Sequence, residues 1–410
     1  MESSFISLLW IAICAVAAPL LAGLVPRRLV PEAVILLVAG VIIGPFGMGL
    51  ATTDDAIGLL RELGLGMLFL LAGYEIELSE LTGRAGRRAL VTWAICLGTA
   101  LALVFLVSLT GALHAEVALA IALCSTALGT LLPILKDGGL LTSPVGKSVM
   151  NHGAYGELGP VIAMAVLLGT GGPAEALVAV IMFALLAAAI TLPWRRIRRE
   201  TSKMMSLIRA GSETTGQTTV RLTVLLLVAL CVLAEVFDLD VVLGAFAAGF
   251  ILRRALPSGD EQLEHKLNGL AFGLLIPVFF VTSGMAIDPA AVAAQPLTLV
   301  LFVLMIMLVR GLPVFLSSKL ERDPTTRQQI FDTRDSARIG LFAATGLPII
   351  VAVTSTAVSA GQMSPANASV LVAGGAITVL TMPLAATLLA GHNKDRLDPP
   401  TSEVSPSRPV

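Results

Sequence analysis

The sequence predicts an all-α protein that crosses a membrane about thirteen times. Of its 410 residues, 56% are hydrophobic and only 13% are charged, whereas a soluble domain carries roughly 25% charged residues. Its mean hydropathy is +0.89, and most of the chain divides into apolar runs long enough for a spanning helix, which needs about 20 residues. The basic residues gather in every second connection between those runs. These observations predict a polytopic membrane protein. No nucleotide motif or nucleophile–base arrangement indicates an enzyme, a cofactor or a nucleic-acid partner.

The expected spans follow one another closely, leaving no stretch long enough for a separate soluble domain. In chain order they are 4–24, 32–50, 56–75, 89–111, 115–136, 147–169, 174–194, 220–237, 240–254, 266–286, 296–318, 337–360 and 367–390. The first run begins without a basic segment, so we expect a retained span rather than a cleaved signal. Residues 391–410 are rich in proline, serine and charge, and we expect a disordered tail.

The Lys and Arg residues predict the orientation, because cytoplasmic loops are enriched in them. All but two of the 27 basic residues lie in alternate connections. This pattern predicts a cell-membrane protein, of the bacterial inner membrane, with its N-terminus outside and its C-terminus in the cytoplasm. The two exceptions, Arg61 and Arg310, lie inside spans. We expect Arg61 to form a local or inter-helix ion pair beside Glu62, whereas the greater depth of Arg310 indicates function.

Three pairs of segments indicate an internal repeat. Residues 69–77 resemble 280–288, Ala39-Gly40 resembles Ala248-Gly249, and Pro133 has a counterpart in Pro348. Chance similarity between apolar segments is the alternative for any single pair. The paired segments lie seven spans apart, and because this number is odd the two copies face opposite ways. Inverted-topology repeats of this kind are typical of secondary transporters.

Spans five and twelve carry residues that interrupt helices near their middle. We expect the breaks at Gly129 and Pro133 in span five, and at Gly346 and Pro348 in span twelve. Proline removes a backbone donor and crowds the preceding turn, while glycine near hydroxyl side chains permits local unwinding. Matched broken helices in the two halves of a repeat predict a transport site between them.

Glu157 is the strongest candidate for an ion-binding residue. It lies about 15 Å from the inner end of span six at 1.5 Å per residue, near the middle of a hydrocarbon core about 30 Å thick. An ionisable residue at this depth marks an ion path or a proton relay. We expect Glu157 to bind the proton and the transported cation in turn. Ser125, Thr126 and Thr345 are expected to complete the ion site, with Arg310 as the counter-charge.

Asn151 and His152 lie nearer the inner surface than Glu157 on the same span. They are candidates for the lining of a cytoplasmic funnel, in which a histidine could sense pH. Packing or interface hydrogen bonding is the alternative for both residues.

Four motifs in order resemble the monovalent cation:proton antiporter superfamily, in its cation:proton antiporter-2 branch with a sodium/hydrogen exchanger membrane domain. They lie at 30–49, 63–77, 125–137 and 277–288. The resemblance covers about 25–390. It places Glu157 at the family's ion-binding aspartate and Arg310 at a common basic position. The chain departs from the family in having Gly156 before Glu157 instead of a second polar residue, and Arg310 instead of lysine.

The resemblance also implies the domain organisation. It implies a homodimer with an exchanger-like membrane domain over 1–390, in which broken spans five and twelve cross. A mobile core would comprise 89–169 and 296–390, a dimerisation scaffold 1–75 and 220–286, and a linker helix 174–219. Elevator-like alternating access would follow.

The function expected is exchange of one Na⁺ or K⁺ for one H⁺, without net charge movement because Arg310 cannot release its proton. Two alternatives remain at this point. One is proton-coupled export of a larger organic cation, for which Gly156 leaves space beside Glu157. The other is a membrane sensor or regulator of the same fold that transports nothing.

Overall fold

The computed structural model is a bundle of α-helices, with no β-sheet among the described residues. The structure describes residues 2–24, 30–76, 81, 83–108, 115–137, 139–168, 178–186, 217–256, 260–323 and 325–389. The first half contains α1 (Glu2–Leu24), α2 (Glu32–Ile43), α3 (Asp55–Glu75), α5 (Gly83–Ser108), α6 (Glu116–Leu123), α7 (Leu128–Asp137), α8 (Pro144–Leu167) and a helix at 178–186. The second half contains α11 (Thr218–Val236), α12 (Val241–Ala255), α13 (Glu261–Leu270), η2 (Ala271–Leu275), α14 (Ile276–Met285), α15 (Pro289–Ala294), α16 (Pro296–Ile306), η3 (Met307–Gly311), α17 (Leu312–Lys319), α18 (Thr333–Ala343), α19 (Leu347–Ser359) and α20 (Pro365–Leu388).

Eight of the described helical segments are long and apolar enough to cross a membrane. They coincide with the expected spans one, three, four, eight and ten to thirteen, while α2, α6 with α7, α8 and α12 form shorter or more polar segments at spans two, five, six and nine. The expected extent of span two is wrong, because α2 ends at Ile43 and the chain turns at Gly44 and Pro45. The expected tail 391–410 and most of the linker 174–219 lie outside the described residues.

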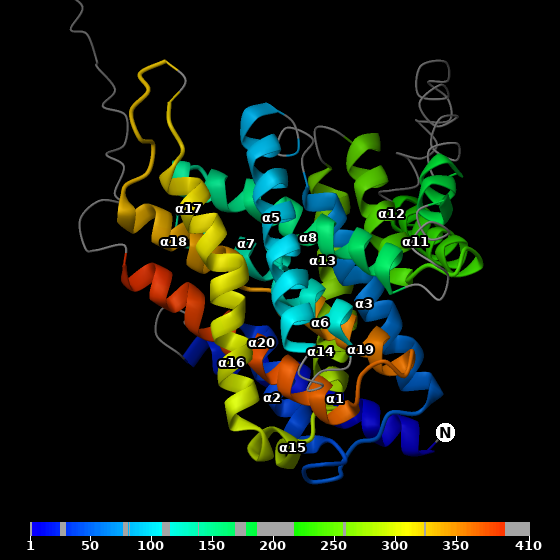
Figure 1. Cartoon of the computed structure of the whole chain (residues 1–410). Coiled ribbons are helices and arrows are strands. Elements are labelled where there is room, and N and C mark those ends of the chain that lie inside the picture. The colour runs from blue at the N-terminus through cyan, green and yellow to red at the C-terminus, as the bar shows by residue number, and fades with distance from the viewer. Residues whose placement is uncertain are drawn as a thin grey trace, which may run out of the picture.

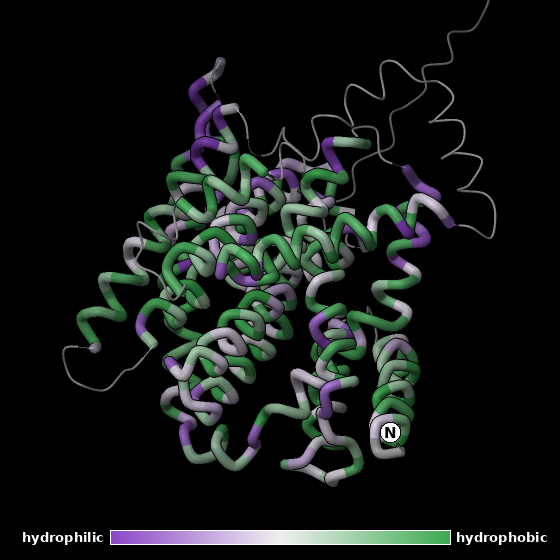
Figure 2. Tube along the Cα trace, turned by 90° about the vertical axis from the view of Figure 1, so that its right-hand side faces the viewer, coloured by the Kyte–Doolittle hydropathy of each residue, from purple (hydrophilic) through white to green (hydrophobic). Residues whose placement is uncertain are grey.

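The connections alternate between two ends of the bundle. Figure 1 places the N-terminus and α15 at the lower end, and the start of α5 and the α17–α18 connection at the upper end. The upper end therefore carries Arg84, Arg87 and Arg88 at the start of α5 and Arg322 after α17. Figure 2 shows hydrophilic segments gathered toward this same end. The basic groups at the start of α5 and after α17 thus lie at one end of the bundle, whereas Arg61 and Arg310 lie within it.

Two glycines bring α2 and α14 into backbone contact. A Cβ atom on Gly40 would lie 2.0 Å from the carbonyl oxygen of Val281, and one on Gly284 would lie 2.0 Å from that of Leu37. No side chain fits at such distances, so the crossing requires glycine on both helices.

A second crossing, between α3 and α12, repeats the first. A Cβ atom on Gly249 would lie 1.8 Å from the carbonyl oxygen of Leu70, and one on Gly73 would lie 2.2 Å from that of Phe246. Gly249 and Gly73 are the repeat counterparts of Gly40 and Gly284. The contact between spans two and ten therefore reappears between their repeat counterparts, spans nine and three, which is the arrangement expected of an inverted repeat.

Both discontinuous helices are present, but the first break is displaced. Helix α6 ends at Leu123 and α7 begins at Leu128, so Gly129 and Pro133 lie within α7 and the prediction that they interrupt it is wrong. The unwound residues are 124–127. In span twelve the break at 344–346 includes Gly346, as predicted, and Pro348 occupies the first turn of α19. Proline is well suited to a first turn, where its missing N–H has no partner within the helix.

Candidate ion-binding site

The two helix breaks lie against each other and are joined by hydrogen bonds. The Ala127 N–H donates to the carbonyl oxygen of Thr345 over 2.7 Å, and the Thr126 hydroxyl donates to that of Ala343. The Thr126 N–H donates to the carbonyl oxygen of Gly156 on α8 over 2.8 Å. Backbone groups released by unwinding are therefore paired with the opposite break or with α8. This is the condition under which irregular backbone is tolerated at membrane depth.

The hydroxyl groups of Ser125 and Thr345 occupy equivalent places in the two breaks. Ser125 Oγ donates to the carbonyl oxygen of Ala122, and Thr345 Oγ1 donates to that of Phe342, each over 2.8 Å. Each hydroxyl thus binds a carbonyl in the last turn of the preceding half-helix. Because a hydroxyl oxygen retains acceptor lone pairs after donating, both expected ion ligands remain able to coordinate a cation.

Glu157 lies on α8 beside the crossing and is only 3% exposed. The backbone N–H of Leu128, the first residue of α7, interacts with its carboxylate. The N-terminus of a helix favours negative charge, so the break places a stabilising group at this carboxylate. The other oxygen, Oε2, is buried without a hydrogen-bond partner. Glu157 therefore presents one open oxygen where a proton or a cation can bind.

Arg310 lies in the π-helical turn η3 and is completely buried. Its Nε donates to Thr126 Oγ1 over 2.9 Å, its Nη2 to the carbonyl oxygen of His152 over 2.6 Å, and its Nη1 to Cys96 Sγ over 3.8 Å. No ion pair joins Arg310 to Glu157 in the described part of the chain. The expected counter-charge is thus hydrogen-bonded to neutral acceptors. Through Thr126 and the His152 carbonyl, Arg310 links the first break to α8.

Gly156 makes room for this arginine. A Cβ atom at position 156 would lie 2.2 Å from Arg310 Nη2 and 2.6 Å from Thr126 Oγ1. The sequence predicted open space beside Glu157 at this position, and that prediction is wrong because the guanidinium group fills it. The glycine and the arginine, the two departures from the family pattern, are therefore adjacent in space.

Glu75 is a further carboxylate near the site, and the sequence predicts no role for it. It ends α3, and its charge acts on Glu157. Its position in the motif at 63–77 was visible in the sequence. No sequence pattern, however, shows that the end of span three approaches the middle of span six. The packing of α3 against α7, and of α7 against α8, connects the helices that carry the two carboxylates.

Asn151 and His152 line a small cavity of about 120 Å³ toward the upper end of the bundle. The cavity is also lined by Arg88, Lys147 and Ser148. His152 Nδ1 bonds to the carbonyl oxygen of Ser148 over 2.9 Å, while His152 Nε2 is buried without a partner. The structure brings both predicted funnel residues to one polar cavity near the basic end of α8.

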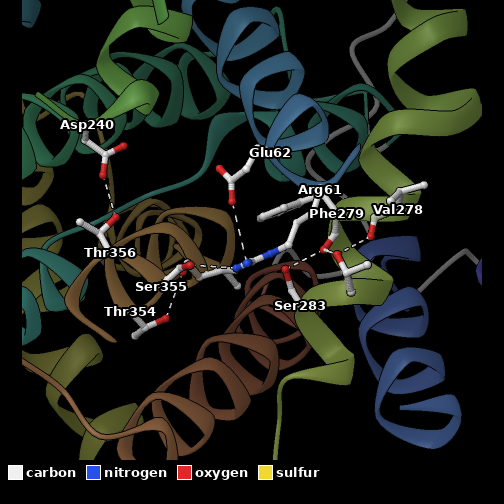
Figure 3. A network of polar contacts seen from close by, with 11 residues as sticks. Arg61, Glu62, Asp240, Val278, Phe279, Ser283, Thr354, Ser355 and Thr356 are labelled. Atoms are coloured by element: carbon white, nitrogen blue, oxygen red, sulfur yellow. Dashed lines mark hydrogen bonds and ion pairs between the residues drawn. The ribbon is translucent and has the colours of Figure 1, made fainter. Parts of the chain in front are cut away.

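A second polar cluster lies at the other end of α19 (Figure 3). Arg61 Nη2 on α3 donates to Ser355 Oγ over 2.9 Å, and Thr356 Oγ1 donates to Asp240 Oδ2 at the start of α12 over 2.7 Å. Arg61 also lies 3.9 Å from Glu62, the local pair predicted from the sequence. Three helices distant in sequence are therefore tied together there, and we call these five residues the lower cluster.

The site combines a carboxylate with backbone and hydroxyl oxygens, the ligands that hard cations prefer. Among the described residues, no group of three or more His, Cys, Asp or Glu side chains forms a metal centre. The single open carboxylate oxygen can hold one proton or help to hold one monovalent cation.

Residues 12–390 match the family model described as "Sodium/hydrogen exchanger, transmembrane". The chain is 27% identical over 274 residues to the putative Na⁺/H⁺ antiporter YjbQ of Bacillus subtilis, covering 63% of this chain and 44% of that protein. It is 26% identical over 310 residues to the glutathione-regulated potassium-efflux system protein KefC of Klebsiella pneumoniae, covering 72% and 47%. The chain thus spans about half the length of these two relatives.

The fold is similar to that of the sodium proton antiporter MjNhaP1 from Methanocaldococcus jannaschii at pH 8. The TM-score is 0.64, with 18% sequence identity and coverage of 94% of this chain and 98% of that one. At this identity the likeness supports the fold over nearly the full length.

Proposed function

The chain belongs to the sodium/hydrogen exchanger family, and from that premise we propose that it exchanges Na⁺ or K⁺ for H⁺ across a membrane. The observation that carries the proposal is the buried Oε2 of Glu157, which has no hydrogen-bond partner beside the crossing of two broken helices. The relatives support both cations, since YjbQ is named as a Na⁺/H⁺ antiporter and KefC as a potassium-efflux protein.

Competition for one carboxylate is the proposed coupling mechanism. A proton on Glu157 removes the charge that attracts a cation, and a bound cation excludes the proton. The hydroxyl oxygens of Ser125, Thr126 and Thr345 and nearby carbonyl oxygens supply the remaining ligands. Arg310 stays protonated throughout. Each transfer therefore moves one positive charge on Glu157, and exchange is one for one and electroneutral.

Glu75 is proposed to draw cations toward the site from the basic end of the bundle. Its carboxylate lies near enough to act on Glu157. A second negative charge raises the local concentration of cations. The cavity lined by His152 provides further polar groups on the same side of the bundle.

Alternating access is proposed as the transport mode, with the lower cluster closed in this structure. The hydrogen bonds at Ser355 and Thr356 tie α19 to α3 and α12. In the proposed division, α19 belongs to a mobile core (89–169 and 296–390), whereas α3 and α12 belong to a dimerisation scaffold (1–75 and 220–286). Movement of the core past the scaffold requires these bonds to break.

The oligomeric state and the orientation in the membrane are also proposed. The protein is proposed to form a homodimer in the bacterial inner membrane, with the basic end of the bundle in the cytoplasm. This places the N-terminus and α15 outside, in agreement with the enrichment of Lys and Arg in cytoplasmic loops.

The two alternative functions are weaker. Export of a larger organic cation rested on space beside Gly156, which Arg310 and Thr126 occupy. A sensor that transports nothing has no need for an unpartnered carboxylate oxygen at a crossing of broken helices.

Everted vesicles with a pH-sensitive dye test the exchange. After acidification, addition of Na⁺ or K⁺ is expected to release protons and restore fluorescence only in vesicles that contain the protein. Li⁺ and a bulky organic cation serve as comparisons. No response to Na⁺, K⁺ or Li⁺ would overturn the proposal in favour of the sensor, and a response confined to the organic cation would favour export.

A further inference from the structure

A long groove runs along the surface between α5 and the helix formed by η3 and α17. Its volume is about 980 Å³. Val91 and Ile95 line it from α5, and Leu312 and Leu316 line it from α17. Thr92 Oγ1 donates to Ser317 Oγ over 2.8 Å and joins the two walls.

The groove faces the region in which lipid surrounds the protein. Its apolar side chains are well exposed, Val91 at 58% and Leu312 at 41%. Both walls belong to helices long and apolar enough to cross a membrane. An occupant must therefore present hydrocarbon to these side chains and enter from within the bilayer.

One end of the groove is positively charged. Arg87 and Arg88 line that end, at the start of α5. Arg88 lies 3.4 Å from Glu321, so its charge is partly balanced. Arg87 is exposed, and neither a hydrogen bond nor an ion pair to its side chain occurs among the described residues. The groove thus joins an uncompensated cation at the membrane boundary to an apolar channel.

We propose that this groove binds an anionic phospholipid. Arg87, assisted by Arg88, holds the phosphate, and an acyl chain lies along Val91, Ile95, Leu312 and Leu316. Arginine suits this role because its planar donors match phosphate oxygens. Basic residues at the boundary select anionic over neutral headgroups, while the apolar walls exclude a free phosphate as sole occupant.

The site has a structural connection to Arg310. Leu308 and Leu312, which line the groove, flank Arg310 in sequence, and Arg310 itself points into the interior. A lipid bound outside η3 therefore packs against the turn that positions the buried arginine. Binding is expected to stabilise the folded protein by an amount that grows with the logarithm of the lipid concentration above the Kd.

Thermal unfolding of the purified, delipidated full chain tests the proposal. The probes are dioleoylphosphatidylglycerol, dioleoylphosphatidylcholine with its neutral headgroup, and glycerol phosphate without acyl chains. The phosphatidylglycerol is expected to raise the melting temperature more than either comparison. Equal effects of the two lipids would overturn the selection of an anionic headgroup, and an equal effect of glycerol phosphate would overturn the role of the groove.

Variants locate the binding. Arg87→Gln is expected to weaken the apparent affinity for phosphatidylglycerol about fivefold, the change that one basic residue near a membrane contributes. Arg84→Gln is the matched control, because Arg84 is an exposed arginine on the same helix outside the groove. Ile95→Trp is expected to weaken binding of both lipids by filling the channel. Equal losses in Arg84→Gln and Arg87→Gln would show general attraction to the surface and overturn the site, as would a dimer contact covering the groove.

Discussion

Arg310 occupies the space that any side chain at position 156 would need. Its Nη2 lies 2.2 Å from the point at which a Cβ atom on Gly156 would stand. Arg310 can therefore occupy this position only because residue 156 is a glycine. In this chain the guanidinium group fills the space at position 156, where the family usually has a second polar residue.

Gly156→Ala is expected to destabilise the protein by about 1–3 kcal/mol, the usual cost of overpacking a buried site. Thermal unfolding measures the effect. Gly129→Ala is the control, since a Cβ there meets nothing within 4 Å. Arg310→Ala should remove the part of the Gly156→Ala penalty that comes from the guanidinium group, while the contact with Thr126 remains, and a double-mutant cycle measures that part. Additive effects of the two substitutions would contradict the steric relationship.

Glu157→Gln is expected to abolish cation–proton exchange without lowering thermal stability. The substitution removes a charge whose burial is costly and keeps the shape of the side chain. The vesicle assay measures exchange, and thermal unfolding checks the fold. Glu116→Gln, at the start of α6 away from the crossing, should leave exchange unchanged. Retained coupled exchange in Glu157→Gln would remove Glu157 from the mechanism.

Glu75→Gln is expected to raise the KM for the cation several-fold while leaving kcat largely intact. The substitution removes a negative charge that attracts cations toward the site. Initial exchange rates at varied cation concentration separate the two constants. An unchanged KM would mean that Glu75 takes no part in cation entry.

Combined Ser355→Ala and Thr356→Val is expected to loosen the lower cluster. Loss of two inter-helix hydrogen bonds, one of them to a carboxylate, should shift the opening equilibrium about tenfold or more. Hydrogen–deuterium exchange should then quicken in 347–359 and 55–62. Thr354→Val is the control, because the Thr354 hydroxyl bonds only within α19. Similar exchange in both variants would argue that the cluster does not hold the helices together.

Asp54 is expected to stabilise the start of α3 only above acidic pH. Its carboxylate accepts hydrogen bonds from the Ser4 hydroxyl and the Ile57 N–H, and these bonds hold its pKa below the ordinary 3.8. A lowered folded pKa means that the contribution is present above pH 3.8 and is lost as the pH falls through the lower folded value. Thermal unfolding of Asp54→Asn and the neighbouring Asp55→Asn across this range measures it. Equal pH profiles for the two variants would contradict the assignment.

Much of the architecture follows from the sequence because hydrophobic length and basic residues are strong local signals. The paired glycine motifs predict an internal repeat, and the structure shows that the same glycines also form two close helix crossings. Glycine and proline predict the first break at Gly129 and Pro133, whereas the structure has it at 124–127. Residues 124–127 unwind for another reason, since the Ala127 N–H and the Thr126 hydroxyl bond to residues more than two hundred positions away and the Thr126 N–H bonds to Gly156.

The partners of buried charges could not be predicted either. Arg310 was expected to face Glu157, but it binds a hydroxyl, a thiol and a carbonyl group. Depth along a helix gives the level of a side chain and not its direction around the axis. Glu75 was overlooked for the same reason, because its closeness to Glu157 depends on helix packing.

Because Arg310 stays charged, a membrane potential can change the rate of the proposed exchange without changing its stoichiometry. With Glu157 occupied by either a proton or a cation, the two residues carry one net positive charge during both half-cycles. A membrane potential does about 2.3 kcal/mol of work per charge per 100 mV, and work gained in one direction is returned in the other. The membrane potential would then set which side of the membrane the loaded ion site mainly faces and how fast the protein turns over. The ion gradients at which net flux reverses would stay the same at every voltage.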